Sequence, residues 1–337
     1  MFLENFQQIQ RIAKGGAAEV FRAVQTGPMG FQRVVAIKRM LPQHIGSVHY
    51  ERMLVQEAKL LVTLKHPNIV QVYDLGCQDG AFFFVMDYVD GLDLRKIIQW
   101  HQNQNRSFPI ENTIIIASEI CKALEYAHNN KSSDGKFLGL VHMDISPKNI
   151  LISRAGEVKL SDFGIAHFKA PKSMEGTKFS LEDHRVVRGK YSYMSPEQAM
   201  GISVEAPSDI FSLGLVLYEL LMGERLYQSQ NLLDLQKEHL NYPAKAPLFS
   251  FDIPSELEYI ILRCLAYEPD DRYQSAAELY HDFIRFLYYG LGTLPNQQLA
   301  FMMEEIMPKN QALPSSSKIS PLEESTLTDL KGVVVNA

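Results

Sequence analysis

The stretch from Val141 to Gly164 limits the possible folds of this 337-residue chain more than any other part of it. It reads Val-His-Met-Asp-Ile-Ser-Pro-Lys-Asn-Ile-Leu-Ile and continues, after a short turn, as Lys-Leu-Ser-Asp-Phe-Gly. The apolar, β-branched residues on either side of the turn predict two short β-strands. Such a pair of strands would hold the side chains of Asp144, Asn149 and Asp162 next to one another.

These three side chains suit one kind of chemistry. The carboxylate of Asp144 can accept a proton from a hydroxyl group, and an Asp together with an Asn can hold Mg²⁺. Phosphoryl transfer from ATP requires such a set of groups. The pattern therefore favours a phosphoryl-transfer site, although a single Asp between apolar strands would also fit a turn.

The overall charge of the chain argues against nucleic acid or a membrane as a partner. With 33 Lys and Arg against 39 Asp and Glu, the net charge is −6. Nucleic acids and anionic membranes both attract basic surfaces. Hydrophobic residues make up 46% of the chain, which is ordinary for a soluble globular protein.

The cysteines and the apolar segments indicate where the protein works. Cys77, Cys121 and Cys264 are far apart, in a spacing that fits neither a disulfide framework nor a zinc site. The N-terminal residues do not resemble a secretory leader, and the most apolar run, Phe211–Met222, is shorter than the ~20 residues of a membrane span. We therefore expect a cytoplasmic protein.

The residue pattern changes near residue 90. Residues 1–90 contain five β-rich runs and one helical stretch, Val48–Leu64, whereas residues 91–292 are mainly helical. Residues 293–337 are expected to form a flexible tail. The sequence therefore predicts an α+β fold. Helices in its second part are expected over Thr113–Asn129, Pro207–Met222, Leu232–Leu240, Ser255–Ala266 and Ser275–Leu287.

Several motifs, in the right order, resemble those of the eukaryotic-like protein kinase family over roughly residues 6–290. Besides the stretch described above, they include Gly-Gly-Ala-Ala-Glu-Val-Phe-Arg-Ala, His-Pro-Asn-Ile-Val and Tyr-Met-Ser-Pro-Glu-Gln-Ala, which are similar to bacterial Hanks-type Ser/Thr kinases. The family signature His-Arg-Asp-Leu-x-x-x-Asn followed by Asp-Phe-Gly is matched except at the Arg and the Leu. The resemblance implies a bilobal fold, with a small five-stranded antiparallel lobe that contains one helix and a larger helical lobe.

The resemblance also implies a role for each polar residue of the site. Asp144 corresponds to the base that accepts the proton of the substrate hydroxyl, and Asn149 and Asp162 correspond to the Mg²⁺ ligands. Lys38 corresponds to the residue that grips the α- and β-phosphates, positioned by an ion pair with Glu57. Taken alone, these last two would be solvated surface charges.

The adenine and ribose of ATP have their own expected contacts. The segment from Met86 to Val89 resembles the hinge, where the backbone of Asp87 and Val89 would meet adenine and Met86 would guard the rear pocket. Asp93 would meet the ribose, although an Asp at a helix N-terminus would look the same. The remaining expected contacts are residues that sandwich the base and residues of the phosphate loop, namely Val20, Ala36, Leu151, Ile12, Ala13, Lys14, Gly15 and Gly16.

Four further residues are expected to support the site without touching the substrate. The resemblance implies that Glu197 pairs with Arg272 and fastens the activation segment to the large lobe. Asp209 is expected to hold the backbone of the catalytic loop. His142 is expected to pack near the Asp-Phe-Gly backbone without an acid–base role.

The chain departs from the family at several positions. Ala13 and Ala18 replace two glycines of the phosphate loop, which makes close backbone approach harder and predicts weaker nucleotide binding. Met143 replaces an Arg that pairs with a phosphorylated residue, so phosphorylation of the activation loop is not expected to be the main switch. Ser146 stands where many Ser/Thr kinases carry a Lys. We hypothesise that Lys190 supplies that cation from across the cleft, the alternative being a solvent-exposed lysine.

Three functions stay open at this point. The first is a Ser/Thr protein kinase that transfers the γ-phosphoryl group of MgATP to proteins, including itself. The second is a pseudokinase, a scaffold that binds nucleotide or partner proteins without catalysis, which the departures at Ala13, Ala18 and Met143 favour. The third is an interaction module whose tail is an autophosphorylated docking segment.

Overall fold

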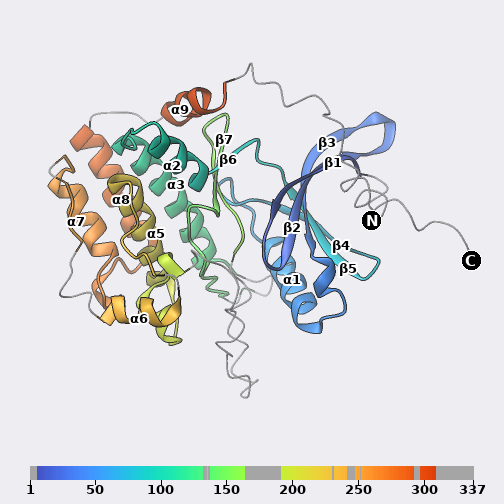
Figure 1. The fold of residues 1–337 in the computed structure, drawn as a ribbon, viewed down its shortest axis with the longest axis horizontal. Coiled ribbons are helices and arrows are strands. Elements are labelled where there is room, and N and C mark those ends of the chain that lie inside the picture. The colour runs from blue at the N-terminus through green and yellow to red at the C-terminus, as the bar shows by residue number, and fades with distance from the viewer. Residues whose placement is uncertain are drawn as a thin grey trace, which may run out of the picture.

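The computed structural model describes residues 6–131, 135, 137–163, 191–229, 231–240, 247–250, 252–291 and 297–308. These residues form two lobes, one rich in strands and ending near residue 90, the other mainly helical (Figure 1). The predicted α+β, two-lobed fold is therefore confirmed. No helix in the described part of the chain is long and apolar enough to cross a membrane.

The small lobe is a five-stranded antiparallel sheet with one helix packed on it. The strand order is β1-β2-β3-β5-β4, and α1 contacts β3, β4 and β5. The elements are β1 (Phe6–Lys14), β2 (Ala18–Thr26), β3 (Gln32–Met40), α1 (Val48–Leu61), β4 (Val72–Gln78) and β5 (Ala81–Asp87).

The two faces of this sheet have different partners, because side chains alternate along each strand. Val20 lies opposite Lys38, and Ala36 lies opposite Met86, so these four residues share one face. Ile37 points to the other face, where it belongs to a separate buried apolar cluster. The register of β2, β3 and β5 therefore places a charged amine and several apolar side chains on the same surface.

The helical lobe is built around α5 (Ala206–Met222). All residues from Pro207 to Leu221 are buried, so this helix lies at the centre of the core. Gly214 permits a close approach of α7, since a Cβ atom there would lie 2.9 Å from the Cβ of Cys264. Other helices of this lobe are α2 (Leu94–Asn103), α3 (Ile110–His128), α4 (Pro196–Met200), α6 (Leu232–Leu240), α7 (Ser255–Cys264) and α8 (Ala276–Arg285).

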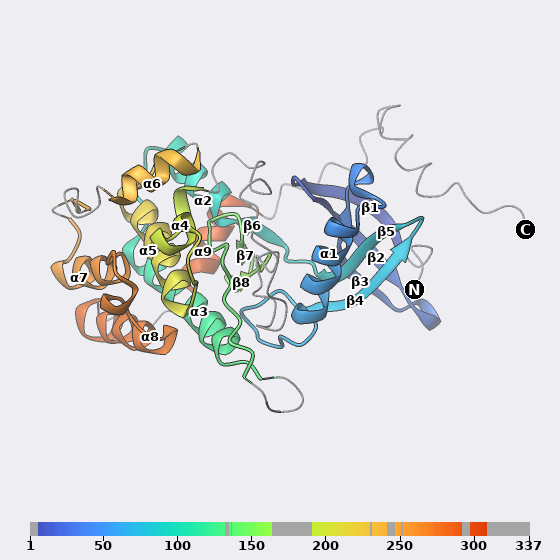
Figure 2. The same cartoon turned by 90° about the horizontal axis from the view of Figure 1, so that it is seen from below.

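A second, three-stranded sheet lies on the side of the helical lobe that faces the small lobe (Figure 2). Its strands are β6 (Gly91–Asp93), β7 (Ile150–Ser153) and β8 (Val158–Leu160). The pair β7–β8 is the one predicted from the stretch Val141–Gly164. The backbone N–H of Val70, which lies between α1 and β4, donates to the carbonyl of Leu160 at 2.9 Å, so this sheet also contacts the small lobe directly.

Most expected elements are present, with differences at their ends. The helix expected over Val48–Leu64 ends at Leu61, and the one expected over Ser275–Leu287 ends at Arg285 and continues as a π-helical stretch, Phe286–Leu291. The helices α2 and α4 were not among those expected. With five residues, α4 is too short to show an apolar periodicity, whereas α2 does show one, with Leu94, Ile97 and Ile98 buried.

The expectation that residues 293–337 form only a flexible tail is wrong for residues 297–308. The helix α9 (Gln298–Ile306) lies against β7, with Leu299, Met302 and Met303 buried (Figure 1). The apolar pattern of this segment is weak by itself, and the helix is stabilised by the surface on which its three buried side chains pack.

Close contacts attach α9 to the large lobe. Gly156 has a φ of +84°, and a Cβ atom there would lie 2.8 Å from the backbone nitrogen of Ala300. Arg154 Nη1 donates to the carbonyl of Met307 at 2.6 Å. Because Gly156 has no side chain, the turn between β7 and β8 leaves room for the backbone of α9. The helix α9 is therefore part of the folded large lobe.

Replacing Met303 by Ala should lower the free energy of unfolding by about 2–3 kcal/mol, because it empties a fully buried position on α9. Phe301→Ala is the matched control on the same helix, and since Phe301 is 64% exposed its effect should stay within about 0.5 kcal/mol. Urea denaturation of the full chain measures both. Equal effects of the two substitutions would contradict the packing of α9.

Candidate active site

Lys38 lies at the centre of the site. Its Nζ atom is 2.7 Å from Glu57 Oε1 and 2.7 Å from Asp162 Oδ1. Because Lys38 belongs to β3, Glu57 to α1 and Asp162 to the segment after β8, one ammonium group joins both lobes. Burial would lower the pKa of Lys38, but the charges and hydrogen bonds of Asp162 and Glu57 outweigh it and raise that pKa, so the amine stays charged at neutral pH.

Asp144 and Asn149 lie on the loop that precedes β7. Asn149 Nδ2 donates to the carbonyl of Asp144 at 2.7 Å, so the Oδ1 atom is the one that this amide can offer to a cation. The backbone N–H of Ser161 donates to the carbonyl of Asn149 at 2.8 Å. The loop before β7 and the segment that carries Asp162 are thereby joined, so the three predicted polar residues lie on adjoining segments.

His142 is fully buried between these segments. Its Nε2 atom is 3.0 Å from the carbonyl of Ser161, and its Nδ1 atom accepts from the backbone N–H of Asp144 at 3.2 Å. These two contacts require the proton to be on Nε2, and burial lowers the pKa of His142. The ring also packs on Phe163, with 4.4 Å between centroids. A structural His142 that packs near the Asp-Phe-Gly backbone is what the sequence predicted.

Asp209, on α5, holds the backbone of the loop. Its carboxylate accepts from the N–H of His142 at 2.7 Å and from the N–H of Met143 at 2.8 Å, and His128 Nε2 lies 2.8 Å from it. Met143 has a φ of 64°, which is unfavourable for a residue with a side chain. Its carbonyl accepts from Gln198 Nε2 at 2.8 Å. Both backbone groups of Met143 are therefore fixed.

The residues expected to surround adenine come from both sheets. Val20, Ala36 and Met86 share one face of the small-lobe sheet, and Leu151 on β7 lies opposite Asp93 on β6. The expected hinge residues Asp87 and Val89 follow at the end of β5 and in the link to β6. In the phosphate loop, Ile12, Ala13 and Lys14 end β1, and Gly15 and Gly16 lie in the turn that follows.

Two of these residues have side chains engaged within the protein. The carboxylate of Asp93 caps α2, since it accepts from the backbone N–H of Lys96 at 3.0 Å and pairs with its Nζ at 2.9 Å. The carboxylate of Asp87 accepts a hydrogen bond from the hydroxyl of Tyr73. For Asp93, the helix-capping alternative raised by the sequence is therefore present.

Two residues that follow β3, Leu41 and His44, contact the backbone of the phosphate loop. The carbonyl of Ala17 accepts from the N–H of Leu41 at 3.0 Å, and the carbonyl of Gly16 lies 3.1 Å from His44 Nε2. The ring of His44 stacks on Tyr50, with 3.8 Å between centroids. These contacts tie the loop to the connection between β3 and α1. Sequence reasoning missed them, because nothing local to the loop indicates them.

The expected pair of Glu197 and Arg272 is a buried, bidentate ion pair, with N···O distances of 2.7 and 3.0 Å. The other donors of Arg272 reach the carbonyls of Pro207, Ala266 and Tyr267, so its guanidinium is fully satisfied. Burial acts to raise the pKa of Glu197, but Arg272 outweighs it and holds that pKa below its usual value. The pair fixes α4 to the large lobe.

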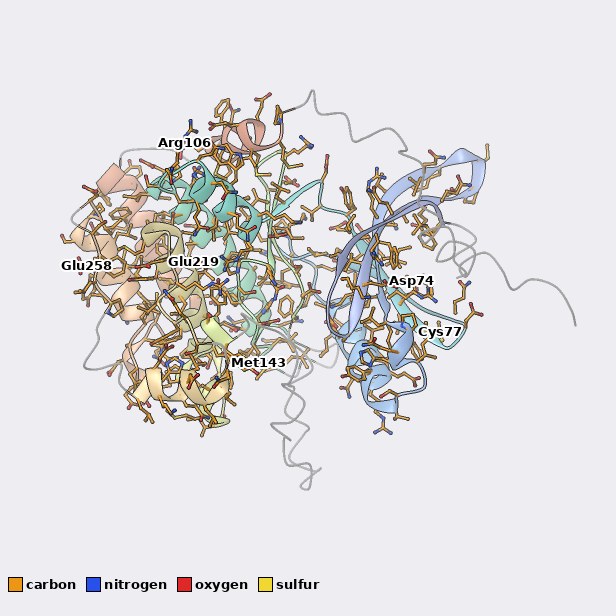
Figure 3. All side chains as sticks on the ribbon, viewed as in Figure 1. Asp74, Cys77, Arg106, Met143, Glu219 and Glu258 are labelled. Atoms are coloured by element: carbon orange, nitrogen blue, oxygen red, sulfur yellow. The ribbon has the colours of Figure 1, made fainter. Side chains whose placement is uncertain are left out.

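A second buried ionic cluster was missed. Glu219, labelled on α5 in Figure 3, is 1% exposed. It pairs with Arg95 at the start of α2 at 2.8 Å and accepts a hydrogen bond from the hydroxyl of Tyr193. The signal that could have revealed it is an acidic residue in the otherwise apolar run Phe211–Met222, since a buried charge needs a partner.

One site residue predicted from the sequence lies outside the described part of the chain. It is Lys190, for which a catalytic role was predicted. The role of Lys190 stays a prediction.

Two lobes joined through the ion-paired Lys38 are the arrangement expected of an enzyme that transfers phosphoryl groups. The model of the protein kinase domain matches residues 6–284. The chain therefore belongs to the protein kinase family.

Relatives at moderate identity cover most of the chain. The tyrosine-protein kinase MasK of Myxococcus xanthus is 36% identical over 85% of this chain and 44% of its own length. The serine/threonine-protein kinase PknB of Mycobacterium leprae is 34% identical over 80% of this chain and 41% of its own length. PrkC of Bacillus subtilis, a serine/threonine-protein kinase, is 33% identical over 82% of this chain and 40% of its own length. The chain spans less than half the length of these relatives.

Proposed function

We propose that this protein transfers the γ-phosphoryl group of MgATP to Ser or Thr hydroxyl groups of proteins, including its own. The observation that best supports the proposal is the pair of 2.7 Å contacts from Lys38 to Glu57 and Asp162. A lysine held in this way across two lobes, with Asp144 and Asn149 on the adjoining loop, is the arrangement that kinase chemistry needs.

The chemical roles follow from the donor set. Asp144 accepts the proton of the substrate hydroxyl while the oxygen of that hydroxyl forms a bond to the γ-phosphorus. The bond between the γ-phosphorus and the oxygen that bridges it to the β-phosphate breaks, which releases ADP. Lys38 orients the α- and β-phosphates. Asp162 and the Oδ1 atom of Asn149 suit Mg²⁺, a hard cation that prefers oxygen ligands and would neutralise charge on the phosphates.

The choice of Ser and Thr over Tyr rests on the relatives. PknB and PrkC are serine/threonine-protein kinases by name, whereas MasK is named as a tyrosine-protein kinase. The phosphorylated amino acid must therefore be identified in any assay. The net charge of −6 supports protein substrates over nucleic acid or an anionic membrane, and the three separate cysteines support a reducing compartment such as the cytoplasm.

Beyond the departures at Ala13, Ala18 and Met143, no observation on the described residues favours the pseudokinase alternative. Ala13 and Ala18 weaken the phosphate loop, but the contacts of His44 and Leu41 hold that loop by other means. The base, the lysine and the metal ligands are all of the required residue types.

Replacing Asp144 by Asn should lower phosphate incorporation from labelled ATP by about 100-fold or more, because the amide no longer accepts the hydroxyl proton. The acceptors are the protein itself and a generic basic protein, and hydrolysis should release phosphoserine or phosphothreonine. Asp79→Asn, an equivalent change in an exposed turn, should leave incorporation unchanged. Wild-type protein that binds MgATP but transfers nothing would contradict the proposal in favour of a scaffold, and recovery of phosphotyrosine alone would overturn the Ser/Thr assignment.

We further propose that Lys190 supplies the cation that Ser146 does not, stabilising charge on the transferring phosphoryl group. Lys190→Met should then lower kcat by about 10- to 100-fold with the KM for ATP nearly unchanged, because the contact develops in the transition state. Lys237→Met, on the surface of α6, is the matched control. An unchanged kcat for Lys190→Met would eliminate this role.

A further inference from the structure

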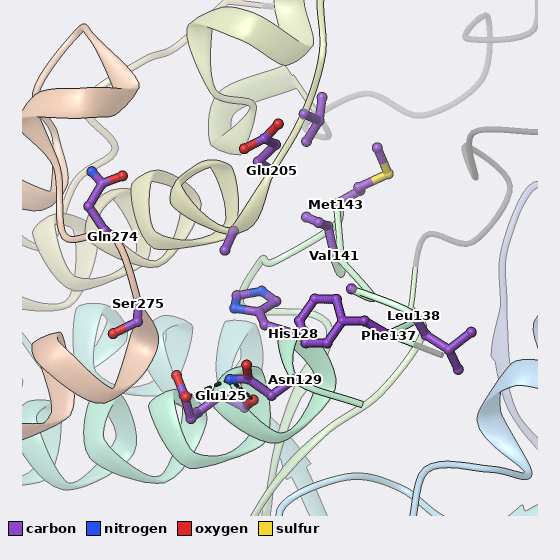
Figure 4. Close-up of a pocket in the computed structure, with 13 residues that line it drawn as sticks. Glu125, His128, Asn129, Phe137, Leu138, Val141, Met143, Glu205, Gln274 and Ser275 are labelled. Carbon is purple, nitrogen blue, oxygen red and sulfur yellow. Dashed lines mark hydrogen bonds between the residues drawn. The ribbon is translucent and has the colours of Figure 1, made fainter. Parts of the chain in front are cut away.

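A pocket in the large lobe lies behind the catalytic loop and takes no part in the proposed chemistry (Figure 4). We name it the α3–α5 pocket. Its volume is about 540 Å³, within the range of sites that bind drug-sized ligands or a few side chains. Four parts of the chain enclose it: the end of α3, the loop 137–143, the start of α5 and residues 274–275 before α8.

The lining of this pocket is apolar and acidic. Phe137, Leu138, Val141, Met143 and Val204 provide apolar walls, whereas the lining contains two glutamates and no Lys or Arg. Glu125 is already engaged, since its carboxylate accepts from the N–H of Ala277 at 3.0 Å and from the amide of Asn129.

Glu205 is the exposed carboxylate of the pocket, and no ion pair to it is found among the described residues. It lies at the N-cap of α5, where a negative charge is favourable, but its side chain makes no capping hydrogen bond. A complementary ligand therefore combines a large apolar group with a positive charge.

Phe137 is exposed yet held in place. Its side chain is 62% exposed, an unusual position for so large an apolar group. Gly139, with a φ of +54°, lets the ring lie close, since a Cβ atom there would be 3.3 Å from the ring. The N–H of Leu138 also donates to the carbonyl of Asn130 at 2.8 Å. The ring is therefore positioned at the mouth of the pocket.

A second exposed apolar residue is close in sequence to the lining of the pocket. Ile202 is 60% exposed and precedes Val204, which lines the pocket, by two positions. Exposed apolar groups next to a concave site are typical of surfaces that another protein covers. A small molecule inside the pocket would leave these side chains in water, so a protein segment is the better match.

The pocket is connected to the catalytic loop by hydrogen bonds. His128, which lines it, is 7% exposed and its Nε2 atom lies 2.8 Å from Asp209 Oδ2. The same carboxylate holds the backbone N–H groups of His142 and Met143. Met143, the residue with the unfavourable φ, also lines the pocket. A ligand in the pocket would therefore contact both His128, the hydrogen-bond partner of Asp209, and Met143.

We propose that the α3–α5 pocket binds a segment of a partner protein in which a large apolar side chain adjoins a Lys or Arg, and that this binding positions the catalytic loop through His128 and Met143. In the family, an Arg at the position of Met143 pairs with a phosphorylated residue of the activation loop. Here, a ligand in the pocket would act on the catalytic loop at that same position. Binding does not depend on the proposed kinase activity, whereas an effect on the rate of transfer rests on it.

The test is selection of peptides against the full-length protein. Random peptides of about ten residues are selected on the wild type, and the enriched ones are made with a fluorophore. Affinities are then measured for the wild type, for Glu205→Lys, and for Ala206→Leu, which fills the pocket. Glu224→Lys, at an exposed glutamate beyond the other end of α5, is the matched control.

The enriched peptides should pair Leu, Phe or Trp with Lys or Arg and should lose at least about tenfold in affinity on Glu205→Lys and Ala206→Leu, but not on Glu224→Lys. Binding should also slow amide hydrogen exchange at residues 142–144, whether or not the protein transfers phosphate. Equal affinities for all variants would overturn the site. Concentration-dependent self-association abolished by Glu205→Lys would overturn the partner in favour of a second copy.

The effect on catalysis is tested separately. Saturating peptide should change kcat for phosphate incorporation by about threefold or more in the wild type and in Glu224→Lys. Unchanged exchange and unchanged kcat despite tight binding would overturn the link to the catalytic loop. A protein that is inactive throughout but shows slower exchange on binding would contradict the proposed function and leave the pocket assignment standing.

Discussion

The ion pairs of Lys38 with Glu57 and Asp162 are the contacts on which the rest of the site depends. The three residues come from a strand, a helix and the end of a second sheet, so the pairs exist only when both lobes are in place. Lys38 and Glu57 are largely buried, and removing one partner of a buried pair costs about 3–5 kcal/mol. The register of β2, β3 and β5 then determines which side chains share the surface around the lysine.

In the helical lobe, buried charged residues of α5 likewise hold other segments in place. This helix is buried along its length, and each acidic side chain that interrupts its apolar sequence holds a different segment. Asp209 holds the catalytic loop, and Glu219 holds the start of α2 together with Tyr193. Because a buried charge without a partner is unfavourable, these residues fix loops that have little regular structure of their own.

The parts of this architecture that depend on local pattern could be predicted from the sequence, and those that depend on distant contacts could not. The pair β7–β8, the long helix α5 and the pairing of Lys38 with Glu57 follow from periodicity and from motifs. The φ of Met143 and its link to His128 depend on a carboxylate 81 residues from that histidine. The helix α9 depends on the turn at Gly156, which leaves room for its backbone. Such contacts have no local pattern in the sequence.

The measurement that tests the account most directly is calorimetric titration of ATP into the wild-type protein and Asp162→Asn, each with and without Mg²⁺. If Asp162 and Asn149 hold the metal beside the lysine, the wild type should bind ATP at least about tenfold more tightly with Mg²⁺, and Asp162→Asn should lose most of that difference. Equal affinities of the wild type with and without Mg²⁺, or an undiminished Mg²⁺ effect in Asp162→Asn, would contradict the assignment of the site.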